Sequence, residues 1–406
     1  MAAVAEGVKR RAGELGWTEE LVSEFEQSQL SESTIRSLLA LRVDADSARA
    51  FMKAAVENPA IAAMNFRWAR PSTQLGVRAR PGEHGLGMPE INIGTYGTVP
   101  DHWPYENDTP LGSHPTPGSY MPGPYSIFSK SEVWAEGSDA LYEQGIRERW
   151  IPAVDIDWGA LSEQPEPIER AICQIATSFA ENGLAEQKVI GSWEERIAYG
   201  FHDIKNLLSV QNFDAGRKVE ALRKRALANG GGLLQSNLGT LYRTWFGALK
   251  ATEWLTSVCV VYKVYEVATF EALAEACPSA VDRKLFSLLA RDSRRHLEYG
   301  VGHLAYYLQY HPNAQEYLGH FIGRAEAALA DEINHSPAVS EALAVLFAGG
   351  TEQLPVGISR LRDLRSAQLK RYLNLLDSVS FNRDSSVNPG LVDIARTGGL
   401  AVAAPQ

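Results

Sequence analysis

The sequence predicts an all-α protein built around an antiparallel bundle of long helices. From residue 131 almost to the end of this 406-residue chain, apolar residues recur every three or four positions. Proline and glycine are confined there to the connections between these segments. Long helical segments joined by modest loops pack side by side, so an antiparallel bundle is expected.

Residues 1–65 are expected to form an N-terminal group of short helices. The stretch TEELVSEFEQ opens on Thr18, a residue type that caps helix N-termini, and SESTIRSLLALRV and DADSARAFMKAAV follow the same pattern.

Residues 66–130 are expected to form a long irregular arm. This segment is rich in proline and glycine and shows no sustained period. Its many aromatic and apolar residues indicate that it packs against another surface, because a true linker would be polar.

The bundle itself is expected within residues 131–310, with long helices near 166–190, 194–227, 236–276 and 281–309. The stretch ANGGGLL, 228–234, predicts a helix end, since it follows no strand and lacks the Lys-Ser/Thr of a phosphate-binding loop. The stretch ACPSAVD, 276–282, predicts a tight turn. Residues 311–406, which include PAVSEALAVLFAGG and VGISRLRDLRSAQLKRYLNLLDSV, are expected to add C-terminal helices that pack on the bundle.

Composition argues against several classes of function. The formal charge of −10 without a basic cluster argues against nucleic-acid binding. The sequence shows neither a signal-peptide pattern nor an apolar run long enough to span a membrane, so a cytoplasmic protein without a membrane role is expected. Cys173, Cys259 and Cys277 lie in apolar helical contexts and are expected to be buried, reduced thiols.

Two helical segments share a charged motif, DAGRK at 214–218 and DSRRH at 292–296. Both resemble the paired D-E-x-R-H motifs of ferritin-like di-iron carboxylate proteins, in particular an oxygenase-like branch with a lead-in similar to ALYEQGIRERWIPAVDIDW, 140–158. The resemblance covers roughly residues 130–350. It implies a ferritin-like four-helix bundle, here with extra N- and C-terminal helices and the irregular arm.

The resemblance also implies where metal ligands would lie. In that family the Glu and His of each motif bind iron from the bundle interior, and two further Glu come from the preceding helices. Nearly all of these positions have changed in this chain, and Glu181 or Glu186 could lie near the first of them. The changed positions are Gly183, Ala215, Lys218, Lys263 and Ser293, and only His296 keeps a ligand type.

These replacements predict that the ancestral di-iron cofactor is lost and that no other cofactor is bound. A di-iron site needs several carboxylates, and protonated lysines would repel iron. The resemblance implies that Asp214 faces His296 and Asp292 faces Lys218, with Lys263 near an acidic partner such as Glu266. The interior is therefore expected to hold a metal-free salt-bridge network, which also includes Arg217 and Arg295.

Three functions remain open at this point. The first is a non-catalytic accessory subunit of an oxygenase-type complex, either a homo-oligomer or a hetero-oligomer with an intact di-iron paralogue, with the arm wrapping a partner. The second is a diverged enzyme that binds a small molecule in the emptied cavity, with Lys263 or Lys218 as Schiff-base nucleophile or base and His296 oriented by Asp214. The third is an oxidoreductase with a single metal at His296 and one of Glu181, Glu186 or Glu266.

Overall fold

The structure is a computed structural model that describes residues 2–28, 30, 32–69, 77–103, 109–119 and 125–400. By its internal contacts the chain divides into two compact units. The smaller unit comprises residues 1–78 with 94–96 and 112–116, and the larger comprises 79–93, 97–111 and 117–406. Each unit has its own hydrophobic core.

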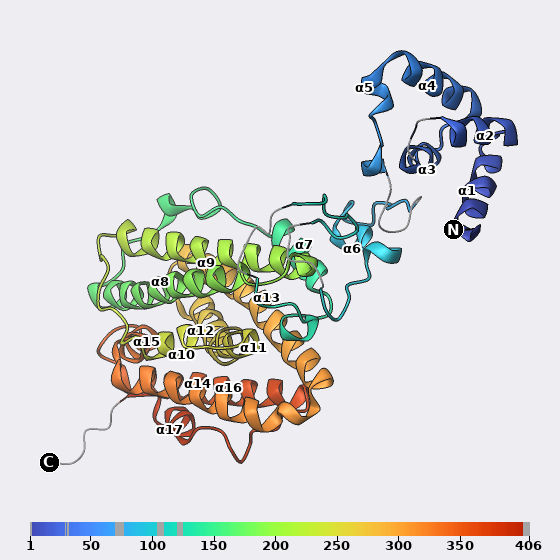
Figure 1. Ribbon diagram of the computed structural model, residues 1–406. Helices are drawn as coiled ribbons and strands as arrows, with labels where there is room; N and C mark the ends of the chain where they lie inside the picture. The colour runs from blue at the N-terminus through green and yellow to red at the C-terminus, as the bar shows by residue number, and fades with distance from the viewer. Residues whose placement is uncertain are drawn as a thin grey trace. The chain divides into compact units, whose positions relative to one another are not determined.

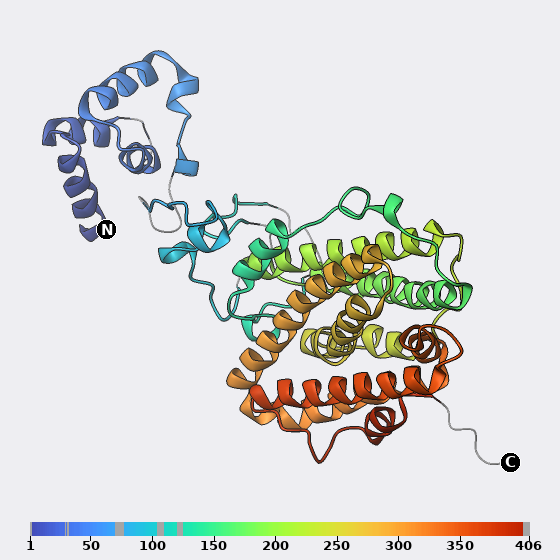
Figure 2. The same cartoon turned by 180° about the vertical axis from the view of Figure 1, so that it is seen from behind.

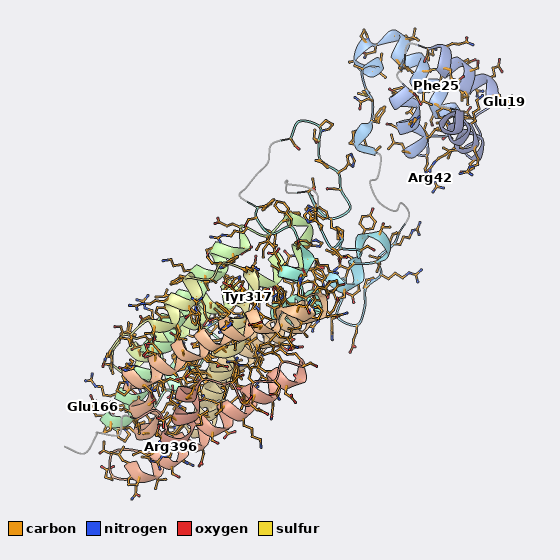
Figure 3. The ribbon with its side chains drawn as sticks, turned by 60° about the horizontal axis from the view of Figure 1, so that its bottom comes forward. Glu19, Phe25, Arg42, Glu166, Tyr317 and Arg396 are labelled. Atoms are coloured by element: carbon orange, nitrogen blue, oxygen red, sulfur yellow. The ribbon has the colours of Figure 1, made fainter. Side chains whose placement is uncertain are left out.

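The smaller unit is a group of short helices. Its helices are α1 (Ala2–Glu14), α2 (Glu19–Gln27), α3 (Glu32–Ala40), α4 (Ala45–Glu57) and α5 (Pro59–Ala62). Thr18 caps α2 by accepting a hydrogen bond from the backbone N–H of Leu21. The ring of Phe25, labelled in Figure 3, stacks on Trp17 with centroids 5.1 Å apart at the centre of this unit's core.

The described part of the arm that belongs to the larger unit packs onto that unit's helices. It contains one short helix, α6 (Met88–Ile91), and otherwise irregular backbone. Val99, Trp103 and Ile127 are buried in the larger core. A side chain at Gly200 would come within 1.9 Å of the Trp103 ring, so glycine is required where the two meet. Residues 70–76, 104–108 and 120–124 of the arm lie outside the described residues.

Four long helices form the bundle of the larger unit, which confirms the predicted all-α class. They are α8 (Glu166–Glu194), α9 (His202–Ala228), α12 (Lys263–Ala276) and α13 (Ala280–Tyr310), with α7 (Ser138–Arg147) beside α9. Figure 1 shows α8 and α9 side by side. The helix end predicted at ANGGG is confirmed by Gly230 and Gly232, which have positive φ, and Ser279 caps α13 after the predicted tight turn. Within the described residues, β structure is limited to isolated bridges.

The third segment differs from the single helix predicted at 236–276. Residues 229–239 instead run along α8, and α10 (Thr240–Phe246) follows. A second helical stretch then runs through α11 (Ala251–Leu255) and a π-helical segment, Thr256–Tyr262, into α12. The break occurs because Gly239 adopts a left-handed conformation and the carboxylate of Glu332 accepts hydrogen bonds from the backbone N–H groups that begin α10.

The C-terminal helices pack on the bundle. They are α14 (Gln315–His335), α15 (Ala338–Ala348), α16 (Leu354–Ser378) and α17 (Pro389–Thr397). Figures 1 and 2 show α14, α16 and α17 on the side of α12 opposite to α8 and α9. Tyr317 of α14, labelled in Figure 3, donates a hydrogen bond to Glu253 of α11.

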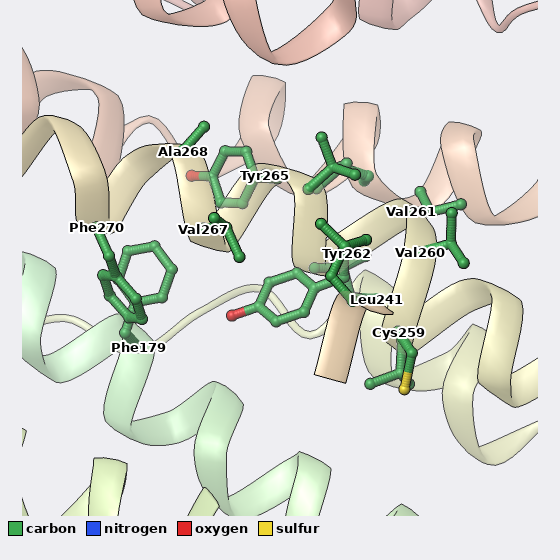
Figure 4. Close-up of a cluster of buried hydrophobic side chains, with 14 of the residues drawn as sticks. Phe179, Leu241, Cys259, Val260, Val261, Tyr262, Tyr265, Val267, Ala268 and Phe270 are labelled. Carbon is green, nitrogen blue, oxygen red and sulfur yellow. The ribbon is translucent and has the colours of Figure 1, made fainter. Parts of the chain in front are cut away.

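Aromatic and β-branched side chains fill the space between these layers. Phe179 of α8 and Phe270 of α12 pack with ring centroids 4.8 Å apart. Tyr265 of α12 and Tyr262, at the end of the π-helical segment, continue the cluster (Figure 4). Cys173, Cys259 and Cys277 are free and buried, as predicted. Within the part of the chain that the structure describes, no helix has the length and apolar character needed to cross a membrane.

Candidate functional site

Four charged side chains meet at the centre of the bundle, and we call them the lysine–glutamate tetrad. Glu186 comes from α8, Lys218 from α9, and Lys263 and Glu266 from the first turn of α12. Each lysine Nζ contacts both carboxylates. The distances to Glu186 are 2.5 Å from Lys218 and 2.7 Å from Lys263, and both lysines also pair with Glu266. Two ammonium ions are thus bridged by two carboxylates in a neutral square.

The tetrad is buried and its hydrogen bonds are satisfied. Lys263 is 1% exposed and Glu266 is fully buried. Glu266 also accepts hydrogen bonds from the hydroxyl of Ser293, at 2.8 Å, and from that of Tyr262, at 3.0 Å. Buried charge is tolerated only when it is paired and hydrogen-bonded in this way.

Neighbouring charges keep both Lys263 and Glu266 of α12 ionised. Burial alone would lower the pKa of Lys263, but attraction to Glu186 and Glu266 outweighs it and holds this pKa above its ordinary value. Burial would raise the pKa of Glu266, but Lys218 and Lys263 hold it well below its ordinary value. Both groups are therefore ionised at neutral pH.

On α8, the carboxylate that enters the site does not lie at Gly183, where the resemblance places the ancestral ligand. The interior carboxylate is Glu186, one turn further along α8, while Glu181 accepts a hydrogen bond from the backbone of Asn237 outside the site. Gly183 instead makes room for α9, because a side chain there would come within 2.8 Å of Val219 and 3.1 Å of the Lys218 Cε.

A second buried network lies next to the tetrad, and we call it the arginine–aspartate cluster. Asp214 and Arg217 come from α9, and Asp292 and Arg295 come from α13. Arg217 pairs with both aspartates, at 2.7 Å from Asp292, and Arg295 pairs with both at 2.9 and 2.8 Å. Two arginines and two aspartates again give a neutral set.

Residues around this cluster complete its hydrogen bonds. Trp150 donates its indole N–H to Asp292 at 2.8 Å, and Glu148 pairs with Arg295 at 3.1 Å. The His296 Nε2 lies 3.2 Å from Asp214, which is the juxtaposition that the resemblance implied. Burial lowers the pKa of His296, although the hydrogen bond to Asp214 opposes this, so the imidazole is neutral at neutral pH.

The expected pairing of Asp292 with Lys218 does not form. Asp292 binds Arg217 and Arg295, whose planar guanidinium groups suit a carboxylate better than an ammonium ion does, and the ion pairs of Lys218 are with Glu186 and Glu266. Lys263 does pair with Glu266, as the spacing of one helical turn allows.

The remaining space at the site is small. Asp214, Ala215, Ser293 and His296 line a cavity together with Glu186, Lys218 and Lys263 of the tetrad, and its volume is about 10 Å³. A cavity of about 10–15 Å³ holds one water molecule. A substrate with several heavy atoms does not fit in this conformation.

The donor set does not fit a di-iron centre. The oxygens of Glu186 and Glu266 are occupied by ammonium groups, Ala215 offers no donor atom, and the Ser293 hydroxyl is committed to Glu266. A metal would have to displace two cations whose carboxylate contacts are already made. Among the described residues, no group of three or more His, Cys, Asp or Glu side chains is arranged to hold a metal ion.

Sequence reasoning left Glu186 as one of several options and did not find Trp150 or Glu148. The helical period could have identified Glu186 as buried, because it lies on the same face of α8 as the buried Phe179, Val189 and Trp193. No comparable signal marks Trp150, which lies in an irregular segment and reaches Asp292 only through the tertiary fold.

Fold and site together define an all-helical bundle protein with two buried ionic networks at its centre. Neither a protein-family model nor a curated protein matches the sequence. One similar solved structure is described as a mutant of an R2-like ligand-binding oxidase with an aerobically reconstituted Mn/Fe cofactor. It shares 16% sequence identity, its match covers 65% of this chain and 92% of that chain, and the TM-score is 0.29. A likeness of that size does not extend to residues or activity.

Proposed function

We propose that this chain is a metal-free ferritin-like protein that serves as a non-catalytic, accessory subunit of an oxygenase-type complex. The observation that carries the proposal is the tetrad. Two lysine ammonium groups bridge two carboxylates between α8, α9 and α12, where the motif resemblance implies two metal ions. The tetrad supplies the positive charge that the carboxylates need, so the bundle centre is closed without metal.

The accessory role follows from the loss of reactive groups at this centre. Lys263 is held as an ammonium ion by two carboxylates, and an ammonium nitrogen has no lone pair for Schiff-base formation. The cavity beside it, about 10 Å³, leaves no room for a carbonyl substrate. This geometry does not favour the alternative of a diverged enzyme that reuses the bundle interior. A single metal at His296 is not favoured either, because Glu186 and Glu266, the interior carboxylates that would share it, are both paired with lysine ammonium groups.

Surface features support a role in assembly. Leu86 and Ile91 of the arm are exposed, at 56% and 41%, although the arm also contributes buried residues to the larger core. Exposed apolar side chains on a segment anchored at other points are suited to contact a partner chain. The complex is expected to be a hetero-oligomer with an intact di-iron paralogue, or a homo-oligomer.

Metal analysis tests the proposal that the chain binds no metal. The full chain would be expressed with ample iron and manganese and purified without chelator, in parallel with a di-iron protein of intact D-E-x-R-H motifs as control. We expect a metal content far below one ion per chain in the test protein and near-complete loading of the control. About two ions per chain would overturn the proposal.

Co-expression tests the proposed accessory role. The chain would be produced with the intact di-iron paralogue from the same genome, and native mass spectrometry would report the masses of the complexes formed. A stoichiometric complex is expected. A chain that stays monomeric both alone and with the paralogue would reject the accessory role while leaving the metal-free centre intact.

A further inference from the structure

A separate pocket lies outside the bundle centre, and we call it the Arg365 pocket. It is formed between α12, α14, α16 and α17 and has a volume of about 40 Å³. Its lining is mostly apolar, and the polar groups that enter it are Arg365 and Gln368 of α16 with the rings of Tyr265 and Tyr372. The apolar lining residues are Val261, Val264, Leu329, Ile333, Leu369, Leu391 and Ile394. Figure 4 shows Val261 and Tyr265, which lie on the α12 side.

Arg365 is a buried cation without a carboxylate partner among the described residues. It is 2% exposed. Its Nη1 donates to the Gln368 side chain and its Nη2 to the Ser340 hydroxyl, both at 3.1 Å, and both acceptors are neutral. Its buried Nε has no hydrogen-bond partner within the described chain. The guanidinium also lies over the Tyr265 ring, 4.8 Å from its centroid, so its charge is met by a ring and neutral oxygens, and its Nε–H donor stays unused.

The buried carboxylate that is linked to the pocket lining is paired with another arginine. Glu326 is linked to the pocket through the hydroxyl of Tyr372, but it pairs with Arg383 at 2.7 Å. The other buried arginines among the described residues of the larger unit are paired, since Arg217, Arg225, Arg295 and Arg383 each contact at least one carboxylate. Arg365 departs from that pattern at a site where a pocket opens beside it.

We propose that Arg365 binds the carboxylate of a small aliphatic monocarboxylic acid of the size of acetate or propionate. The guanidinium fork offers two parallel N–H donors to a carboxylate. The aliphatic side chains of α14 and α17 surround the short apolar tail. A volume of about 40 Å³ holds about three water-sized groups, which matches these acids and excludes larger ones in this conformation. The proposal is independent of the function proposed above.

Methyl NMR on the full chain tests the proposal at the site itself. Protein with labelled Ile, Leu and Val methyl groups would be titrated with sodium propionate, with propionamide as a neutral probe of the same shape, and with sodium chloride at matched ionic strength. We expect saturable shifts of the methyl groups of Ile333, Ile394 and Leu329 with propionate. Hydrogen bonds to charged groups contribute about 1.5–3 kcal/mol, so propionamide is expected to bind at least about tenfold more weakly.

Matched variants assign the binding to Arg365. Arg365→Met removes the guanidinium and is expected to raise the Kd for propionate by about tenfold or more. Arg362→Met makes the same substitution at an exposed position of α16 and is expected to leave the Kd unchanged within about twofold. If Arg365→Met fails to fold, Leu369→Trp fills the pocket from a half-buried position and is expected to abolish the shifts.

Three results would overturn the proposal. The first is equal binding of propionate and propionamide, and the second is equal affinity of the wild type and Arg365→Met. The third is a chloride titration that gives the same shifts as propionate, which would identify an adventitious anion contact only.

Discussion

Lys263 shows how single residues determine the balance of charge at the bundle centre. Its Nζ is one of two cations that neutralise Glu186 and Glu266, and all four groups are buried. Breaking a buried ionic network by removing one partner leaves an uncompensated charge, and this cost exceeds the net stability that the intact network contributes.

Lys263→Met is therefore expected to lower the free energy of unfolding by about 3–5 kcal/mol. The substitution keeps the aliphatic bulk and leaves the two glutamates with a single ammonium ion. Chemical denaturation would measure the loss, with Lys284→Met at an exposed position of α13 as the control, for which a change within about 0.5 kcal/mol is expected. Equal stabilities of the two variants would show that the tetrad does not form.

A compensating substitution tests whether charge balance is the cause. Lys263→Met combined with Glu266→Gln leaves one lysine and one glutamate in the tetrad. The loss in the double variant is expected to be smaller than the sum of the two single losses by about 1–3 kcal/mol. Denaturation of the wild type, the two single variants and the double variant gives the coupling energy between the two side chains directly. Additive losses would argue that the two side chains act separately.

His303 provides a pH-dependent contribution at the residue scale. Its Nδ1 lies 3.0 Å from the Trp134 carbonyl oxygen and its Nε2 lies 3.0 Å from the Thr252 hydroxyl, so the neutral ring donates to the former and accepts from the latter. Burial lowers the pKa of His303 from 6.5 to about 4. The unfolded chain thus binds a proton that the folded chain does not bind at intermediate pH.

The stability contributed by this difference is present above pH 6.5 and is lost as the pH falls toward 4, and it amounts to about 3 kcal/mol. His303→Gln removes the titration. The difference in unfolding free energy between wild type and variant is expected to shrink over this range as the pH falls. The exposed His335→Gln serves as the control. A difference that stays constant with pH would contradict the shifted pKa.

At the scale of elements, the long helices were predictable because their apolar periodicity extends over many turns. The bounds expected for α8 and α13 agree with the observed Glu166–Glu194 and Ala280–Tyr310 to within a few residues. The break before α10 was not predictable in the same way. It depends on Glu332 of α14, distant in sequence, which caps α10 through the backbone of residues 238–240.

The candidate site was predictable in its location and less so in its pairing. The resemblance implied that Asp214, Lys218, Asp292 and His296 lie together, and all four line one cavity between α9 and α13. Which cation meets which carboxylate depends on side-chain length and on helix separation, and neither is encoded in spacing. Lys218 was the predicted partner of Asp292, and the structure instead pairs Asp292 with Arg217 and Arg295.

The contact of α8 with α9 depends on Gly183. A Cβ there would meet Val219 at 2.8 Å and the Lys218 Cε at 3.1 Å, beside the tetrad. Gly183→Ala is expected to cost about 1–3 kcal/mol through overpacking. Gly191→Ala on the same helix meets only Asn212, at 3.8 Å, and is expected to stabilise by about 0.5–1 kcal/mol because alanine favours the helix. Thermal unfolding of both variants shows whether each substitution lowers or raises the stability. A stabilising Gly183→Ala would contradict the close packing of α8 and α9.

At the scale of the whole molecule, the described residues form two hydrophobic cores that share no residues. Phe25 lies in the core of the smaller unit and Phe270 in that of the larger, and both side chains are fully buried. Units with separate cores can unfold separately, since each buries its own apolar surface.

Paired core substitutions test that independence, because Phe25→Ala and Phe270→Ala remove the same side chain from different cores. Each is expected to cost its own unit about 3–5 kcal/mol. Hydrogen exchange measured by mass spectrometry would follow peptides from residues 8–57 and 166–310 in the same sample. Phe25→Ala should reduce protection in the first set alone, and Phe270→Ala in the second alone. Reduced protection in both sets from either substitution would show that the chain unfolds as one cooperative unit, because a single global equilibrium would then control exchange throughout.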